Sequence, residues 1–131
     1  MKSLANKPDH AQLLEAVKNA SEGWQAAFNH GDAASCASYY ETAATMQADP
    51  LGRFVGTTEI RQFWQNLIAQ GFDSVEYIEP KVSVLTPDSA LLTSMWLMNK
   101  ASGVIHKELW VLQPDGTAKL REDHFEVLSP L

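Results

Sequence analysis

The sequence lacks the features that mark several large classes of protein. Its only cysteine is Cys36, so no disulfide can form within the chain and a cysteine-based metal site is not expected. No apolar run approaches the roughly 20 residues of a membrane-spanning helix. The first ten residues have no apolar segment of the kind that a secretory signal requires. These absences predict a soluble cytoplasmic protein that does not bind membranes.

Basic residues are scarce as well. The chain has 10 Lys and Arg against 16 Asp and Glu, which gives a net charge of −6, and no basic cluster is long enough to follow a row of phosphates. Because nucleic acids attract proteins through such clusters, no nucleic-acid partner is expected. His, Asp and Glu do not occur at the local spacing of a metal site, so neither a metal nor another cofactor is predicted.

Apolar residues, in contrast, are plentiful. They make up 45% of the 131 residues and include four tryptophans and five phenylalanines. A chain of this length and composition suffices for one domain with a substantial core. No linker or repeat divides the sequence, so we expect a single domain over residues 1–131, with its core at about 9–128.

The first half of the chain has helical periodicity. Asp9 is a suitable N-cap with Gln12 three residues on, and Gly31 is suited to end the helix because glycine adopts positive φ. A second, short helix, "AASCASYY", is expected after Asp32, and a third helix is expected with Thr57 or Thr58 as its N-cap. Apolar residues recur every three or four positions along the first helix: Leu13, Val17, Ala20, Trp24 and Ala27.

The second half of the chain has strand periodicity. A first strand, "ETAATMQAD", is expected between the second and third helices. Four more runs, "SVEYIEPKVSVL", "SALLTSMWLMN", "GVIHKELWVLQ" and "TAKLREDHFEVL", are separated by turn signals typical of antiparallel neighbours. Pro80 marks a bulge or an edge position in the first of the four. The order predicts an α+β fold whose sheet curls around the first helix and can leave a cavity.

One long segment resembles a known family. "FNHGDAASCASYYETAATMQADPLGRFVGTTEIRQFW" is similar to the front half of NTF2-like proteins, closest to their ketosteroid isomerase-like and SnoaL-like small-molecule branch. With the later strand order, the resemblance covers roughly residues 9–128. It implies a cone of three N-terminal helices packed on a curved, mostly antiparallel sheet that encloses a pocket, and a homodimer formed through the sheet. The matching features are Asn29-x-Gly31-Asp32, Tyr39-Tyr40, Ala44-Thr45, Asp49-Pro50-x-Gly52 and Gly56-x-x-x-Ile60-x-x-Phe63.

The resemblance also implies roles for individual residues. In a ketosteroid isomerase of this family, a strand-end aspartate moves a proton next to a ketone, while a tyrosine and a neutral carboxylic acid hydrogen-bond the enolate oxygen. Asp49 falls on the position of the base, Glu108 on that of the neutral acid, and Trp24 on that of the tyrosine. The chain departs from the pattern at Trp24 and by one additional residue before Asp49.

Asp49 therefore has two interpretations. It is either a general base at the mouth of the cavity or a turn residue before Pro50, since Asp-Pro often opens a turn. Because strand side chains alternate between faces, a slip of one residue without a bulge turns Asp49 away from the cavity.

The later strands supply further candidates. Alternation in "VIHKELWVL" places His106, Glu108 and Trp110 on one face, and pairing with "LREDHFEVL" brings His124 beside them. A glutamate desolvated in such a pocket wall has a raised pKa and can donate a hydrogen bond. The alternatives are an exposed glutamate or one paired with a nearby Lys or Arg, and histidines with a structural role.

Bulky residues gather around the expected cavity. Any one of them is typical of a core, but together they indicate a pocket for an apolar or ring-bearing small molecule. The residues expected to bind it are Trp24, Tyr39, Phe54, Phe63, Trp96, Met98, His106 and Trp110.

The leading hypothesis is a small-molecule enzyme, an isomerase or lyase of the ketosteroid isomerase-like type. It would use cofactor-free acid/base chemistry, with Asp49, Glu108 and His124 as the catalytic residues. One alternative is a ligand-binding module without chemistry. The other is a protein-interaction domain that uses the sheet face.

Overall fold

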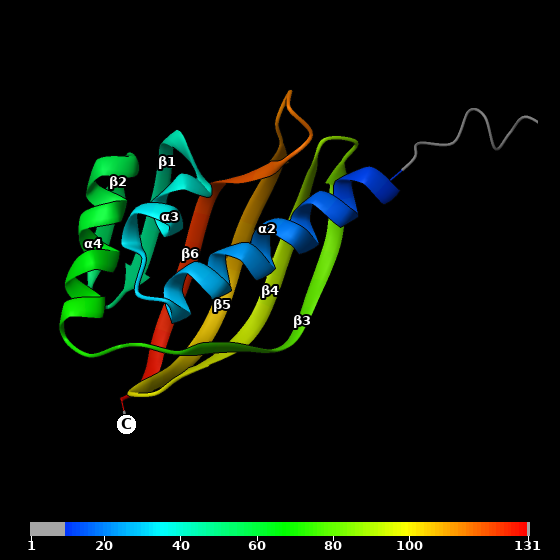
Figure 1. The fold of residues 1–131 in the computed structure, drawn as a ribbon. Coiled ribbons are helices and arrows are strands. Elements are labelled where there is room, and N and C mark those ends of the chain that lie inside the picture. The colour runs from blue at the N-terminus through cyan, green and yellow to red at the C-terminus, as the bar shows by residue number, and fades with distance from the viewer. Residues whose placement is uncertain (1–9, 131) are drawn as a thin grey trace, which may run out of the picture.

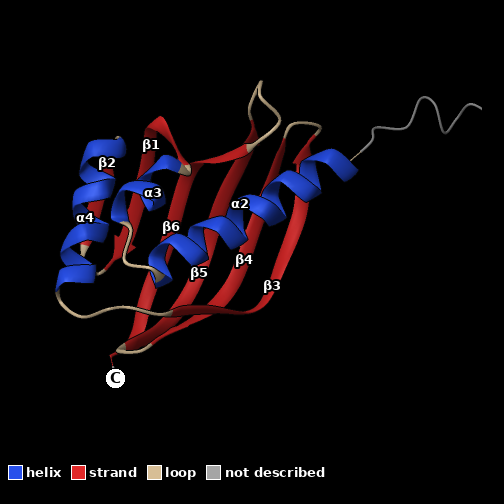
Figure 2. Ribbon diagram, in the orientation of Figure 1, coloured by secondary structure: helices blue, strands red, loops and turns tan. Residues whose placement is uncertain are grey.

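The computed structural model describes residues 10–130. In this part of the chain, three helices lie on one face of a single six-stranded sheet, and the longest crosses it diagonally (Figures 1 and 2). The predicted α+β cone is confirmed. The helices are α2 (Ala11–Asn29), α3 (Ala33–Ser38) and α4 (Thr57–Ala69), and the strands are β1 (Tyr40–Asp49), β2 (Gly52–Val55), β3 (Val75–Thr86), β4 (Ser89–Met98), β5 (Ala101–Leu112) and β6 (Ala118–Pro130).

The strands follow the order β2-β1-β6-β5-β4-β3 across the sheet. β3 to β6 form the predicted antiparallel meander, and β6 then pairs with β1 in parallel. β2 was not predicted, because its four residues follow the Asp49-Pro50 turn and resemble loop. They pair back on β1, with Phe54 opposite Met46.

The helices form where periodicity predicts them, but the N-cap of α4 is Gly56 rather than the predicted Thr57 or Thr58. Leu13, Val17 and Trp24 are buried on one side of α2, whereas the predicted cap Asp9 lies outside the described residues. Asp32 caps α3 by accepting a hydrogen bond from the Ser35 amide at 3.0 Å. α3 is shorter than predicted, since Tyr40 already belongs to β1. No helix within residues 10–130 is long and apolar enough to cross a membrane.

Register shifts bend the sheet and decide which side chains face the helices. β3 is an edge strand, and its pairing with β4 shifts between Ile78 and Lys81. The predicted bulge or edge position at Pro80 is therefore confirmed in both respects. Further shifts occur once between β4 and β5 and three times between β5 and β6. Such shifts reverse the alternation of side chains between the two faces.

The core lies between the helices and the inner face of the sheet. Trp24 of α2 and Trp64 of α4 meet edge to face, with ring centroids 5.0 Å apart, and Trp64 stacks on Phe125 of β6 at 5.7 Å. Gly103 of β5 makes room for another ring, because a Cβ at that position would come within 2.6 Å of Trp96. Aromatic side chains from helices and strands therefore enclose the centre of the molecule.

Candidate active site

A small cavity lies between the helices and the inner face of the sheet. The volume open to the centre of a water-sized sphere is about 20 Å³. A single water needs roughly 10–15 Å³ of such volume, so the cavity is slightly larger than one water requires. Its walls are five aromatic rings, those of Trp24, Trp64, Tyr77, Trp96 and Phe125, completed by Val75, Met98 and Ile105. Among the described residues, the only ionisable side chains that line it are those of Tyr77 and of two acids, Glu108 and Asp123.

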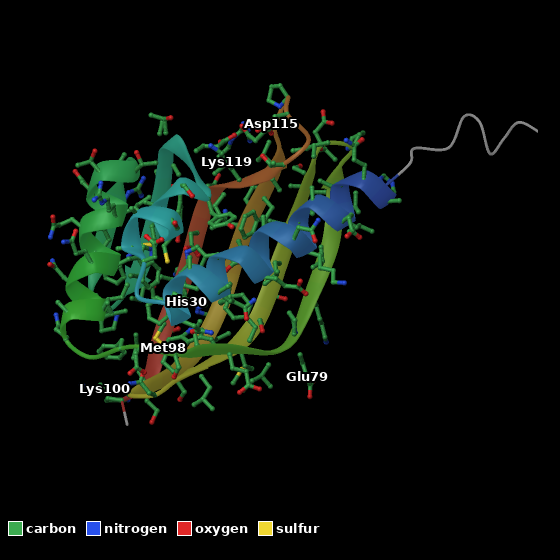
Figure 3. The ribbon with its side chains drawn as sticks, viewed as in Figure 1. His30, Glu79, Met98, Lys100, Asp115 and Lys119 are labelled. Carbon is green, nitrogen blue, oxygen red and sulfur yellow. The ribbon has the colours of Figure 1, made fainter. Side chains whose placement is uncertain are left out.

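The cavity lies toward one end of the sheet. Figure 3 shows Met98 at the end where His30 follows α2, whereas Asp115 and Lys119 lie at the opposite end. The last turn of α2 is fixed there because Asn29 accepts a hydrogen bond from the Val75 amide at 2.7 Å. Val75 in turn pairs with Met98 across β3 and β4.

Glu108 is buried and fully hydrogen-bonded. The residue is 3% exposed to solvent. Trp110 Nε1 donates to Oε1 at 2.9 Å, and the Tyr77 hydroxyl donates to Oε2 at 2.7 Å. Two neutral donors from β5 and β3 therefore hold the carboxyl group in one orientation.

Asp123 lies directly opposite Glu108 in the pairing of β5 with β6. It is 5% exposed, and its Oδ2 accepts a hydrogen bond from the Tyr40 hydroxyl at 2.7 Å. Its other oxygen, Oδ1, has no hydrogen-bond partner among residues 10–130. Asp123 therefore offers one free acceptor atom beside the cavity.

Burial gives both acids an unusual protonation behaviour. Desolvation, followed by the charge of Asp123, raises the pKa of Glu108 above its ordinary value, although the Tyr77 and Trp110 hydrogen bonds oppose the shift. Desolvation also raises the pKa of Asp123, against the Tyr40 hydrogen bond and the charge of His124. Two adjacent carboxyls in a dry site cannot both ionise easily. The pair therefore retains a proton to higher pH than exposed acids do.

Two bulges bring these acids together. Ile105 and Glu108 both face the core although they are three residues apart, because His106 is an additional residue between paired positions of β5 and β6. Leu120 and Asp123 both face the core for the same reason, with Arg121 as the additional residue.

The predicted grouping of His106, Glu108 and His124 does not occur. The bulge turns His106 to the outer face of the sheet, where its side chain is 42% exposed and contacts Glu126 at 2.8 Å. His124 alternates with the buried Asp123 and also faces outward. The two imidazole rings lie 4.9 Å apart, on the opposite face from Glu108.

Asp49 also lies on the outer face. From Ala44 onward the buried residues of β1 are Ala44, Met46 and Ala48, so Asp49 alternates away from the core. Its side chain is 38% exposed, accepts from Gln47 at 2.7 Å and contacts His124 Nε2 at 2.8 Å. These hydrogen bonds, that of His124 first, lower the pKa of Asp49. The placement of Asp49 beside the cavity is thus corrected: strand alternation without a compensating bulge points it outward.

The aromatic candidates separate into two groups. Trp24, Trp96 and Met98 line the cavity as predicted, and Trp110 lies behind Glu108 as its hydrogen-bond donor. Three others do not line the cavity: Tyr39, which borders a groove beside α2, and Phe54 and Phe63, which pack on each other between β2 and α4.

Three indole N–H groups around the cavity lack well-formed hydrogen bonds within residues 10–130. They belong to Trp24, Trp64 and Trp96. The Trp64 N–H lies near the Tyr40 hydroxyl, since it affects the pKa of that group, but those of Trp24 and Trp96 have no partner. Buried polar groups are normally satisfied in native proteins. Unsatisfied donors and one unsatisfied acceptor, all in cavity-lining residues, indicate a site for a ligand or water.

Solved structures of the same architecture cover nearly the whole chain. A candidate scytalone dehydratase from Novosphingobium aromaticivorans matches with a TM-score of 0.77 at 12% identity, over 90% of this chain and 85% of that one. A ketosteroid isomerase-like protein from Erwinia carotovora atroseptica gives 0.75 at 18%, over 89% and 97%. A candidate NTF2-like dehydratase from Streptomyces avermitilis gives 0.70 at 19%, over 87% and 94%.

The fold is NTF2-like. At these identities the likeness shows the fold alone, and it confirms the architecture that the resemblance implied. No family model matches the sequence, and no curated protein sequence does so significantly. We therefore infer the function of this chain from the residues of its own cavity.

Among the cavity residues, the sequence analysis missed Asp123 and Tyr77 in particular, and it also missed Tyr40, which donates a hydrogen bond to Asp123 without lining the cavity. Simple alternation from Leu120 places Glu122 and His124 on the inner face and Asp123 on the outer one. A signal was present: Phe125 and Val127 are apolar at odd positions, which indicates that the odd face of β6 is buried and includes Asp123. Tyr40 was missed because its segment has the pattern of a helix.

Proposed function

We propose that the protein is a cytoplasmic small-molecule enzyme of the ketosteroid isomerase-like type that performs cofactor-free acid/base chemistry with Asp123 and Glu108. The observation that carries this proposal is a pair of adjacent buried carboxyls, of which Asp123 keeps one oxygen, Oδ1, free beside the cavity. Neighbouring carboxyls with raised pKa values are suited to general acid/base catalysis near neutral pH. The structural likeness to a ketosteroid isomerase-like protein and to candidate dehydratases supports the same reaction class.

The two acids have different tasks. Asp123 Oδ1 accepts a proton from a C–H or O–H group of the substrate, because it is the free acceptor at the cavity. Glu108, held by Tyr77 and Trp110, carries the proton that the pair retains and gives it to a second substrate atom. One proton leaves the substrate and one returns. The product is an isomer, or an alkene and water if the proton goes to a departing hydroxyl group.

This proposal moves the base from Asp49 to Asp123. Asp49 and His124 lie on the outer face of the sheet and form their own hydrogen bond. Neither lines the cavity, so neither is expected to contact a substrate there. His124 acts only through its charge, which lowers the pKa of Asp123.

The substrate is proposed to be apolar or ring-bearing, because aromatic side chains form most of the cavity wall. The cavity of about 20 Å³ admits only a small group. A ring therefore requires side chains to move, and Met98 is the adaptable one because it is unbranched and has three rotatable bonds.

Proton exchange tests the proposal without knowledge of the product. Cyclic ketones and hydroxy ketones are incubated with the protein in D₂O, and loss of the α-hydrogen signal is followed by NMR. We expect exchange with the wild-type protein and with Asp49→Asn, but not with Asp123→Asn. Exchange that persists in Asp123→Asn while Asp49→Asn abolishes it would return the role of base to Asp49.

A binding module without chemistry is the second candidate. The unpartnered N–H groups of Trp24 and Trp96 favour it, because they can hold a ligand oxygen without any proton transfer. In that case ligand affinity survives Asp123→Asn but falls when Trp96 is shortened to Ala. Tryptophan fluorescence titrations of the two variants distinguish the candidates.

We also propose a homodimer formed through the outer face of the sheet. Met95 and Ile78 are paired across β4 and β3 and are 51% and 39% exposed, and Leu97 beside them is 38% exposed. Apolar side chains gathered on one face favour association. Light scattering should give twice the chain mass of 14.5 kDa. A monomer at micromolar concentration would instead leave this face free for another protein, the third alternative.

A further inference from the structure

The cavity has acids but no base to neutralise them. Glu108 and Asp123 line it, whereas no Lys, Arg or His does among the described residues. Their direct partners are the neutral donors Tyr40, Tyr77 and Trp110. Burying a carboxylate without a cation is unfavourable. A positive charge in the cavity would therefore stabilise the ionised forms of these two acids.

The walls favour a positive charge as well. The rings of Trp24 and Trp64 meet edge to face with centroids 5.0 Å apart, and that of Trp96 meets Phe125 at 6.3 Å with an interplanar angle of 86°. The faces of aromatic rings carry negative potential and attract cations, tryptophan most strongly. Aromatic walls around buried acids are typical of sites that bind ammonium groups.

The indole N–H groups add a second requirement. Those of Trp24 and Trp96 are buried and have no acceptor among residues 10–130. An ammonium group offers only donors, so it cannot satisfy them. A ligand that satisfies the whole cavity needs an oxygen acceptor close to its positive charge.

We propose that the cavity binds the ammonium group of an amino alcohol or amino ketone. Asp123 Oδ1 accepts a hydrogen bond from the ammonium, and the indole N–H groups bind the ligand oxygen. The space of about 20 Å³ fits a small head group, so the apolar body of the ligand extends beyond it. The proposal rests on the proposed function in taking this cavity as the ligand site.

Binding of a cation here is coupled to proton release. The titratable groups that face the site are Tyr40 of β1, Tyr77 of β3, Glu108 of β5 and Asp123 of β6, while α2 and α4 contribute indoles. Burial makes the two carboxyls retain a proton, and a neighbouring ammonium favours their ionised forms. The proton therefore leaves as the ligand enters, which a neutral ligand does not cause.

Three matched probes separate charge from shape. 2-Amino-1-phenylethanol has both the ammonium and the hydroxyl group, 1-phenyl-1,2-ethanediol replaces the ammonium by hydroxyl, and 2-phenylethylamine lacks the oxygen. Affinity is measured by tryptophan fluorescence, and proton release by calorimetry at pH 7 in buffers of different ionisation enthalpy. We expect the amino alcohol to bind at least about 10-fold more tightly than either other probe, with proton release.

Variants identify the group responsible. Asp123→Asn and Glu108→Gln should each weaken amino-alcohol binding about 10-fold or more and leave diol binding unchanged, whereas Asp49→Asn on the outer face should change neither. Thermal unfolding of each variant verifies that it is folded. Equal affinity for amino alcohol and diol, no binding of any probe, or amine binding that both cavity variants retain would overturn the proposal.

The outcomes remain distinct from those for catalysis. Proton exchange on ketones by a protein without amine preference overturns the amine proposal and leaves the proposed function intact. Amine preference without proton exchange on any substrate supports the amine proposal and overturns the proposed function. That outcome identifies a binding module.

Discussion

The two faces of the sheet carry the same kinds of residue in very different states. On the inner face, Glu108 and Asp123 are 3% and 5% exposed and bond to neutral side chains. On the outer face, the side chains of Asp49 and Glu126 are 38% and 40% exposed and bond to histidines. Solvent contacts and stabilises the outer carboxylates, whereas the inner carboxyl groups are buried away from it. The face, rather than the residue type, therefore decides how readily each acid holds a proton.

β6 shows this contrast within two residues. Burial raises the pKa of Asp123, whereas the hydrogen bond from its neighbour His124, across the sheet, lowers the pKa of Asp49. An exposed carboxylate with a lowered pKa is a weak base. The buried one is the stronger base and retains its proton closer to neutral pH.

The largest expected difference is in catalysis. Asp123→Asn should reduce kcat/KM by about 100-fold or more, since a positioned general base contributes roughly 10²–10⁴. Asp49→Asn, the same change on the outer face, should stay within about 3-fold of wild type, and steady-state kinetics on a substrate found by proton exchange measures both. Similar losses in the two variants would remove the distinction between the faces.

The second difference is in stability. Tyr40→Phe removes the only hydrogen bond that Asp123 Oδ2 accepts within residues 10–130, and loss of a buried partner costs about 1–3 kcal/mol. Urea unfolding at pH 7 measures the free energy of unfolding. The control is His106→Gln on the outer face, where an exposed ion pair contributes little. An unchanged stability of Tyr40→Phe would show that water replaces the hydroxyl group.

The third difference is in the pH dependence of stability. Because the pKa values of Glu108 and Asp123 are raised by burial, the native state binds more protons than the unfolded state once pH exceeds about 4, where unfolded carboxyls ionise. The free energy of unfolding then falls as pH rises toward the native pKa values, by about 1.4 kcal/mol per pH unit for each additional proton that the native state holds. Glu108→Gln and Asp123→Asn should reduce this decline, which urea unfolding across this pH range measures. A decline that both variants retain would assign it to other groups.

The smallest expected effect belongs to the outer face itself. Glu126→Gln removes the exposed contact with His106 and should leave thermal stability within experimental error in about 0.5 M salt, where such charges are screened. Calorimetry at low and high salt makes the measurement. A large loss of thermal stability in high salt would show that Glu126 and His106 are buried, as they would be at a dimer interface.

Much of the architecture was predictable. The spacing of Leu13, Val17 and Trp24 specifies the buried side of α2, and the turn signals specify the meander. The site was less predictable, because two bulges control it. No feature of the sequence identifies His106 or Arg121 as the additional residue of a bulge. β2 was missed because four residues after a turn carry too little pattern.

The sequence by itself determined the α+β architecture and the aromatic core, because these follow from periodicities of three to four residues or of two. Only the tertiary structure decided that Asp123 faces inward and Asp49 outward. That choice depends on how β6 is aligned with β5 and β1, and a shift of a single residue reverses it. Register is set by packing across the whole sheet, so a local pattern such as Phe125 and Val127 in β6 can indicate the buried face but does not fix it.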